Sequence, residues 1–97
     1  MVMRDNTRII MTISKDITSE EMEKLFYKDK TLKEHYTLSG NFKIELKMNN
    51  KPCVTFYATK INCYYDNKLH YIDLWKVGEF IATILPNDCE VVVHEFL

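Results

Sequence analysis

The feature that most constrains the fold is the stretch from Phe42 to Met48, in which apolar and charged side chains alternate at every position. The apolar positions are Phe42, Ile44, Leu46 and Met48, and the charged positions are Lys43, Glu45 and Lys47. Because successive side chains of a β-strand point to opposite faces, this alternation predicts a strand with one buried face and one face in water.

A second strand is predicted directly after this one, because residues 49–52 are typical of a turn. Asn tolerates positive φ, and Pro lacks the N–H that a central strand donates, so Asn49-Asn50-Lys51-Pro52 favours chain reversal. The second strand is Cys53–Thr59, and we expect one of its rows to face the core: Val54, Phe56 and Ala58. Tyr57 then lies on the open side of the sheet.

Further strands are predicted from short runs of β-branched and aromatic residues. Ile61–Tyr65 is the third central strand, closed by Asp66-Asn67-Lys68, and Leu69–Ile72 is its short return in a hairpin meander. Thr7–Ile13 is predicted as the first strand of the chain and Cys89–Phe96 as the last.

A first helix is predicted from about Ser19 to Tyr27 or beyond, with a break near Lys30-Thr31 as an alternative. Thr18 as N-cap and Glu21 three residues later form a capping box, in which each side chain satisfies a free backbone N–H. The apolar residues expected to support this helix are Ile17 and Met22 as a hydrophobic staple, then Leu25, Phe26, Leu32 and Tyr36. Ser39-Gly40-Asn41 is predicted to turn the chain into the central strands.

A second helix is predicted after Asp73 as N-cap, because the apolar residues that follow recur at helical spacing: Leu74, Val77, Gly78, Ile81, Ile84 and Leu85. Trp75 and Phe80 lie off this stripe, so one of them is expected at its margin. Pro86-Asn87-Asp88 is predicted to end the helix.

These elements predict a single α+β domain over residues 1–97. The expected architecture is one antiparallel or mixed sheet of four to six strands with two helices packed on one face, in the order β-α-β-β-β-(β)-α-β. A chain of 97 residues with 46% hydrophobic residues is long enough to build one core without metal or disulfide support.

Composition excludes several classes of function. No apolar run approaches the roughly 20 residues that cross a bilayer, and no secretory signal is evident, so a cytoplasmic location without a membrane is expected. Three cysteines without a CxxC pair favour a reducing compartment. Two glycines leave no room for a glycine-rich phosphate loop, and no cofactor is predicted.

Candidate catalytic and metal-binding residues lack the spacing that such sites require. Metal ligands would have to come from Cys53, Cys63, Cys89, His35, His70 and His94, and no metal site is predicted. A nucleophilic site would combine Cys53 or Cys63 with His70 and Asp73, and an acid–base site would combine Glu34, His35 and Tyr36. Core cysteines and surface histidines explain these residues better, so the protein is predicted not to be an enzyme.

Nucleic-acid binding is an alternative function. The stacking residues would be Tyr57, Tyr64, His94 and Phe96, with Lys43, Lys47 and Lys60 nearby. The charge argues against it, because the net charge is −1. Residues 1–60 carry 11 Lys/Arg and 8 Asp/Glu, whereas residues 61–97 carry 2 and 6.

Protein binding is the predicted function. The sheet face that the helices leave open would present the binding residues Tyr57, Tyr64, Thr55, Lys43 and Lys47, with Trp75 at a margin. The partner is another protein or a second copy of the chain; alternatively, the tyrosines are half-buried spacers. A chain rich in Lys, Ile, Asn and Tyr is typical of phages and mobile elements, which makes an inhibitor of a host defence protein the most concrete form. A protein that sequesters a small molecule is a further alternative, and it requires a deep cavity.

Overall fold

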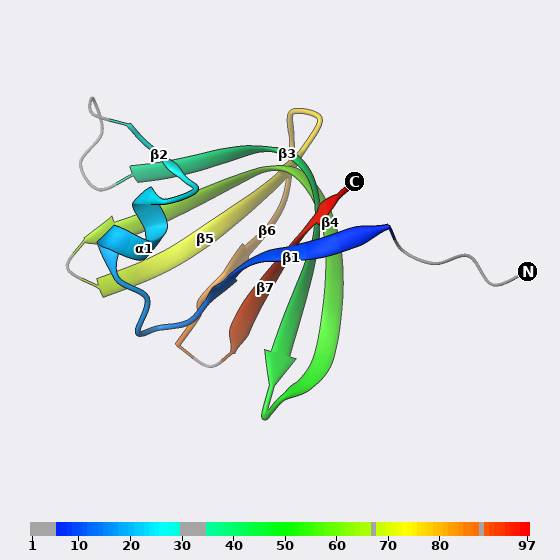
Figure 1. Ribbon diagram of the computed structural model, residues 1–97, viewed down its shortest axis with the longest axis horizontal. Coiled ribbons are helices and arrows are strands. Elements are labelled where there is room, and N and C mark those ends of the chain that lie inside the picture. Colours follow the sequence, from blue (N-terminus) through cyan, green and yellow to red (C-terminus); the bar gives the residue numbers. More distant parts are fainter. Residues whose placement is uncertain (1–5, 30–34, 67, 88) are drawn as a thin grey trace, which may run out of the picture.

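The computed structural model of the protein describes residues 6–29, 35–66, 68–87 and 89–97, with the backbone alone at residues 29, 66 and 68–70. Within these ranges the chain forms seven strands and one helix (Figure 1). In chain order they are β1 Thr7–Ile13, α1 Ser19–Glu23, β2 Tyr27–Asp29, β3 His35–Met48, β4 Lys51–Asp66, β5 Lys68–Lys76, β6 Glu79–Ile84 and β7 Glu90–Phe96. The strands form one antiparallel sheet in the order β1-β7-β3-β4-β5-β6, and β2 pairs with β3.

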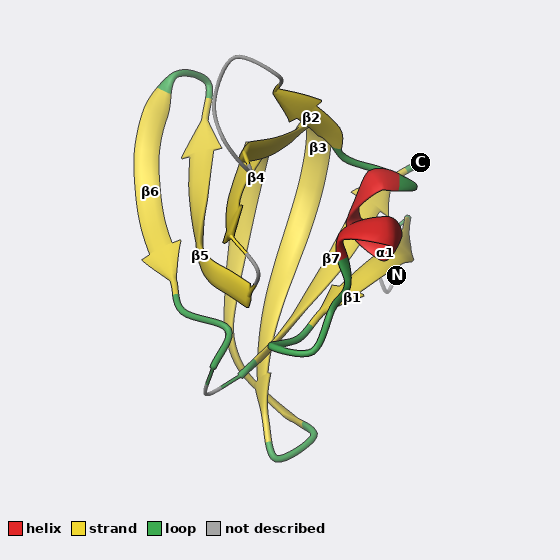
Figure 2. Ribbon diagram, turned by 90° about the vertical axis from the view of Figure 1, so that its left-hand side faces the viewer, coloured by secondary structure: helices red, strands yellow, loops and turns green. Residues whose placement is uncertain are grey.

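The long strands β3 and β4 are bent, and the bend divides the sheet into two halves. Residues 35–39 of β3 and 60–66 of β4 join β2, β5 and β6 in what we call the β5 half. Residues 42–48 of β3 and 51–58 of β4 join β1 and β7 in the β7 half. Figure 2 shows β5 and β6 on one side and β1, β7 and α1 on the other, with β3 and β4 between them.

The bend coincides with a bulge between Ser39 and Phe42, where the register of β3 against β4 shifts. Gly40 lies in this bulge, and the ring of Phe42 packs against it so closely that a Cβ on Gly40 would lie 2.8 Å from Cζ of Phe42. A glycine at this position therefore lets a continuous strand turn from one half of the sheet to the other.

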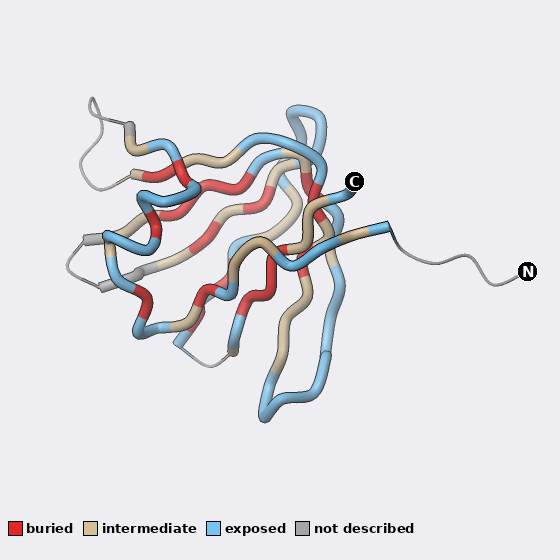
Figure 3. The backbone as a smooth tube through the Cα atoms, in the orientation of Figure 1, coloured by how far each residue is buried: buried red, intermediate tan, exposed pale blue. Residues whose placement is uncertain are grey.

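The core fills the inside of the bend, and buried segments of both halves face one another there (Figure 3). β3 contributes Tyr36, Phe42 and Ile44, and β4, β5 and β7 contribute Ala58, Ile61, Cys63, Ile72, Leu74, Val91 and Val93. α1 and its flanks add Ile17, Met22 and Phe26 to the same cluster. The Tyr65 hydroxyl donates to the Ile17 carbonyl at 3.2 Å, which ties β4 to the segment before α1.

Several local predictions are confirmed. β1 has the predicted bounds, and β7 differs from its predicted bounds by one residue. The Glu21 N–H donates to the Thr18 hydroxyl at 3.2 Å, which is one half of the predicted capping box, and the Glu21 carboxylate accepts from the Thr18 hydroxyl at 3.3 Å. Asn49 and Asn50 adopt φ of 52° and 65°, the positive values of a two-residue hairpin turn.

The predicted α+β class is wrong, since the chain is nearly all β and its one described helix has five residues. Among the described residues no helix layer covers a face of the sheet, and the sheet closes its own core by bending. Seven strands also exceed the four to six that were expected.

The second predicted helix, from Asp73 to Leu85, is wrong and is the hairpin of β5 and β6. Val77 and Gly78 form its turn, with φ of 47° and 80°. Ile72 and Leu74 pair with Cys63 and Ile61 of β4, so contacts between strands override a local pattern that fits a helix.

The first predicted helix is too long, because α1 ends at Glu23 and Tyr27 already belongs to β2. The predicted turn at Ser39-Gly40-Asn41 is wrong, since β3 continues through it as a bulge. The two central strands predicted as Cys53–Thr59 and Ile61–Tyr65 are one strand, β4. The predicted roles of Leu32 and Asp88, and the alternative break near Lys30-Thr31, lie outside the described residues.

Candidate binding face on the outside of the sheet

A row of polar side chains crosses the outer side of the β5 half, opposite the core. In register, Asn62 lies between Thr37 of β3 and Asp73 of β5. The Thr37 hydroxyl donates to Oδ1 of Asn62 at 2.9 Å, and the Thr83 hydroxyl donates to Oδ1 of Asp73 at 2.6 Å. Asn62 is only 6% exposed. Hydrogen bonds between strands therefore hold this row in one arrangement.

Three aromatic rings stack beside the polar row, one from each of β3, β4 and β5. The ring centroids of His35 and Tyr64 are 4.7 Å apart, with 7° between the ring planes. Those of Tyr64 and Tyr71 are 4.4 Å apart, with 22° between the planes. The stack follows from the register, which aligns these three residues across adjacent strands.

Trp75 and Phe80 extend the aromatic surface toward the β5–β6 turn. Their centroids are 5.5 Å apart in an edge-to-face arrangement, and Phe80 is 53% exposed. We call the set His35, Tyr64, Tyr71, Trp75 and Phe80 the aromatic face. Beside Trp75 lies an open pocket of about 490 Å³, lined by Ser39, Thr59, Lys60, Asn62, Trp75 and Gly78.

The surroundings of the central phenol of the stack disfavour its ionised form. Burial raises the pKa of Tyr64 above its ordinary value of 10.0, and the Asp73 carboxylate and Tyr71 raise the pKa further.

A second patch lies on the outer side of the β7 half. Tyr57 is 47% exposed and stacks against Phe96, with ring centroids 6.1 Å apart. Lys43 lies opposite Tyr57 in register. Nε2 of His94 contacts Oε1 of Glu45 on the same side, and Lys43 and Glu45 give this patch charges of both signs.

The six residues predicted for protein binding thus divide between two patches. Tyr64 and Trp75 lie on the aromatic face, whereas Tyr57, Thr55, Lys43 and Lys47 lie on the β7 half. The prediction missed Asn62 and three members of the aromatic face: His35, Tyr71 and Phe80. The alternation of Tyr71, Asp73 and Trp75 was the available signal, and assigning 73–85 to a helix concealed it.

The residues predicted as nucleic-acid stacking platforms are also divided. Tyr57, His94 and Phe96 lie on the β7 half and Tyr64 on the β5 half. Because His94 contacts Glu45, its ring is already paired with an acidic side chain. These four residues do not form one continuous platform.

The three cysteines occupy different environments: of the two candidate nucleophiles Cys53 is exposed and Cys63 is buried, and Cys89 lies between these extremes. Burial raises the pKa of the Cys63 thiol well above its ordinary value of 9.0, and Asp73 adds to the effect. Because the thiolate is the nucleophile, Cys63 is a core residue rather than a reactive one.

The described residues do not bring together the other candidate chemical sets. Asp73 binds Thr83 on the outer face, away from the core that encloses Cys63, and the side chain of His70 lies outside the description. Tyr36 is fully buried, and Glu34 lies outside the described residues. In the described ranges, no three His, Cys, Asp or Glu side chains group as metal ligands.

No family model matches the chain, and no similar curated protein or solved structure was found. None of the helical segments in the described ranges has the length and apolar character that a membrane span requires.

Proposed function

We propose that the protein is a non-enzymatic binding module that docks another protein on its aromatic face. The observation that carries the proposal is the stack of His35, Tyr64 and Tyr71 on the side of the sheet opposite the core. Aromatic side chains at the centre of an interface contribute much of its binding free energy.

The arrangement of the face supports this proposal in a second way. The rings already contact one another, so they lose little rotamer freedom when a partner covers them. The polar row from Thr37 to Thr83 is already hydrogen-bonded, so a partner covers it without leaving those oxygens unpaired.

The most concrete form of this function is inhibition by occlusion of a host protein's surface in the cytoplasm. Composition motivates it, because a short chain rich in Lys, Ile, Asn and Tyr is typical of phages and mobile elements. Three free cysteines agree with a reducing compartment.

Nucleic acid is the less favoured partner, because Asp73 adjoins the stack and the net charge is −1.

Self-association has one specific observation in its favour. Residues 51–58 of β4 pair with β3, and no strand of the described ranges pairs with their other edge. Pro52 and Lys51 on that edge are residues that discourage strand addition.

The test is capture of a partner from the native host with Tyr71→Ala and Tyr64→Ala as variants and Tyr57→Ala as the matched control. We expect both stack variants to keep a cooperative thermal transition and lose the captured protein, while the control retains it. A truncated hot-spot residue weakens binding by about 2 kcal/mol or more. If only Tyr57→Ala loses the captured protein, the partner binds the β7 half instead of the aromatic face. Captured nucleic acid whose affinity falls steeply with salt would contradict a protein partner.

A further inference from the structure

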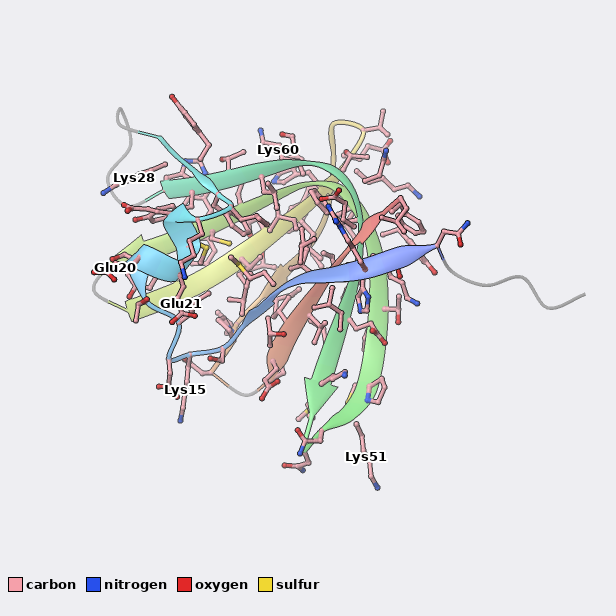
Figure 4. All side chains as sticks on the ribbon, viewed as in Figure 1. Lys15, Glu20, Glu21, Lys28, Lys51 and Lys60 are labelled. Carbon is pink, nitrogen blue, oxygen red and sulfur yellow. The ribbon has the colours of Figure 1, made fainter. Side chains whose placement is uncertain are left out.

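The pocket beside Trp75 is large enough for a small ligand. Its volume of about 490 Å³ lies within the range of roughly 300–1,000 Å³ typical of small-molecule sites. It opens on the outer side of the β5 half, where Lys60 projects away from the strands (Figure 4). Gly78 lines the pocket without a side chain, and a Cβ placed there would meet no atom within 4 Å.

The side chains that line the pocket offer donors and no carboxylate. Lys60 contributes an ammonium group, and no ion pair joins it to any described residue. Ser39 and Thr59 contribute hydroxyls. Oδ1 of Asn62 accepts from Thr37, and the amide NH₂ of Asn62 adds a donor. Because Asp73 lies beside Asn62 in register and Lys60 is a single ammonium, such a lining favours a small ligand with one anionic group over a polyanionic strand.

Trp75 adds a buried donor that lacks an acceptor. Within the described part of the chain, Nε1 of Trp75 is buried and has no hydrogen-bond partner. A buried N–H without an acceptor is unfavourable, and native proteins leave few of them. The N–H has almost no accessible surface, so an acceptor atom in the pocket beside Trp75 would relieve this state only once the indole turns to expose it.

Trp75 and Phe80 also supply a ring surface next to these donors. Indole and phenyl rings bind planar ligands by stacking, and this interaction tolerates many ring types. Ammonium and hydroxyl donors therefore lie on the same pocket wall as an aromatic surface.

We propose that this pocket binds a small organic oxyanion that carries a planar ring. Lys60 holds the anionic group, the Trp75 N–H donates to one of its acceptors, and the ring lies against the aromatic surface. The proposal does not depend on a protein partner.

The chain has a single tryptophan, so tryptophan fluorescence and the indole N–H signal in a ¹H–¹⁵N spectrum both report on Trp75 alone. The full chain is titrated with adenosine monophosphate, adenosine and inorganic phosphate, which separate the ring from the anion. We expect saturable binding of the monophosphate, with the indole N–H resonance moving downfield as it gains an acceptor. The other two probes should bind more weakly by about tenfold or more.

Two lysine variants locate the site. Lys60→Gln should weaken monophosphate binding by about tenfold or more, whereas Lys51→Gln, at the distant tip of the β3–β4 hairpin, should leave it unchanged. Trp75→Phe keeps an aromatic ring but removes the N–H donor, so it should also weaken monophosphate binding. Because this variant lacks tryptophan, its binding is measured by calorimetry. The proposal is overturned by no saturable binding of the monophosphate, by equal binding of adenosine, or by equal effects of the two lysine variants.

Discussion

The ring of Tyr64 lies against the ring of Tyr71 with 4.4 Å between the centroids, on the face of the sheet opposite the core. The two residues are paired across β4 and β5, so the backbone register holds the contact in place. A pair of this kind stabilises the fold and also presents a rigid surface to a partner, and these two roles can be measured separately.

Coupling between the two tyrosines should be measurable in a double-mutant cycle. We expect Tyr64→Ala and Tyr71→Ala to interact by about 0.5–1.5 kcal/mol in the free energy of unfolding, measured by urea denaturation. The Tyr57–Phe96 pair, with 6.1 Å between centroids, is the control and should show a smaller coupling. Strict additivity of Tyr64 and Tyr71 would show that their stacking contributes nothing.

The β5–β6 turn contains a residue that fits its backbone poorly. Val77 has a φ of 47°, so the backbone of this β-branched residue is in the left-handed region. Its side chain is 81% exposed, so no burial compensates for the strain. Val77→Asn should raise the free energy of unfolding by about 1 kcal/mol, because Asn suits this turn position. Asn49, with φ of 52°, provides the inverse test: Asn49→Val should lower stability by a similar amount. Unchanged melting temperatures in both variants would refute the assignment of strain.

Gly40 should be intolerant of a side chain, because the Phe42 ring occupies the space of its Cβ. Gly40→Ala is expected to lower the free energy of unfolding by about 1–3 kcal/mol, as overpacking does. In a Phe42→Leu background the same substitution should be less harmful, since the ring that clashes is gone. An identical penalty in both backgrounds would place the effect in the backbone instead of the ring.

The raised pKa of Tyr64 predicts a dependence of stability on alkaline pH. Because the pKa of Tyr64 is higher in the folded state, its contribution to the free energy of unfolding is fully present below its ordinary pKa of 10.0. This contribution is lost as the pH rises through the pKa of the folded state. Tyr64→Phe should therefore reduce the loss of stability above that pH. Asp73→Asn removes a neighbouring negative charge, so the phenolate absorbance of Tyr64 should appear at lower pH than in the parent protein. A titration that Asp73→Asn leaves unaltered would rule out the contribution of this carboxylate.

The three thiols should react at different rates with a disulfide reagent. Cys53 is exposed and should react in the folded protein, whereas the buried, protonated Cys63 should react only on unfolding. Cys53→Ser should remove the fast phase of the reaction. If that phase persists in the variant, a different thiol is the accessible one.

Local chemistry alone determined the ends of several elements. The strand over residues 42–48, the two asparagines after it and the N-cap at Thr18 each involve neighbours in sequence, and each occurs as predicted. The alternation does not hold to the hairpin tip, because Met48 and Val54, which were predicted to face the core, are 47% and 44% exposed. The predicted exposure of Tyr57 also follows from alternation within one strand.

Only the tertiary structure decided that residues 73–85 form a hairpin and that β3 bends at Gly40. The pattern from Leu74 to Leu85 fits a helix and a strand pair alike, and pairing with β4 selected the strands. The aromatic face depends on the same choice, because Tyr71 meets Tyr64 only when β5 lies beside β4 in this register. Register is set by partners far away in sequence, so no local pattern contains it.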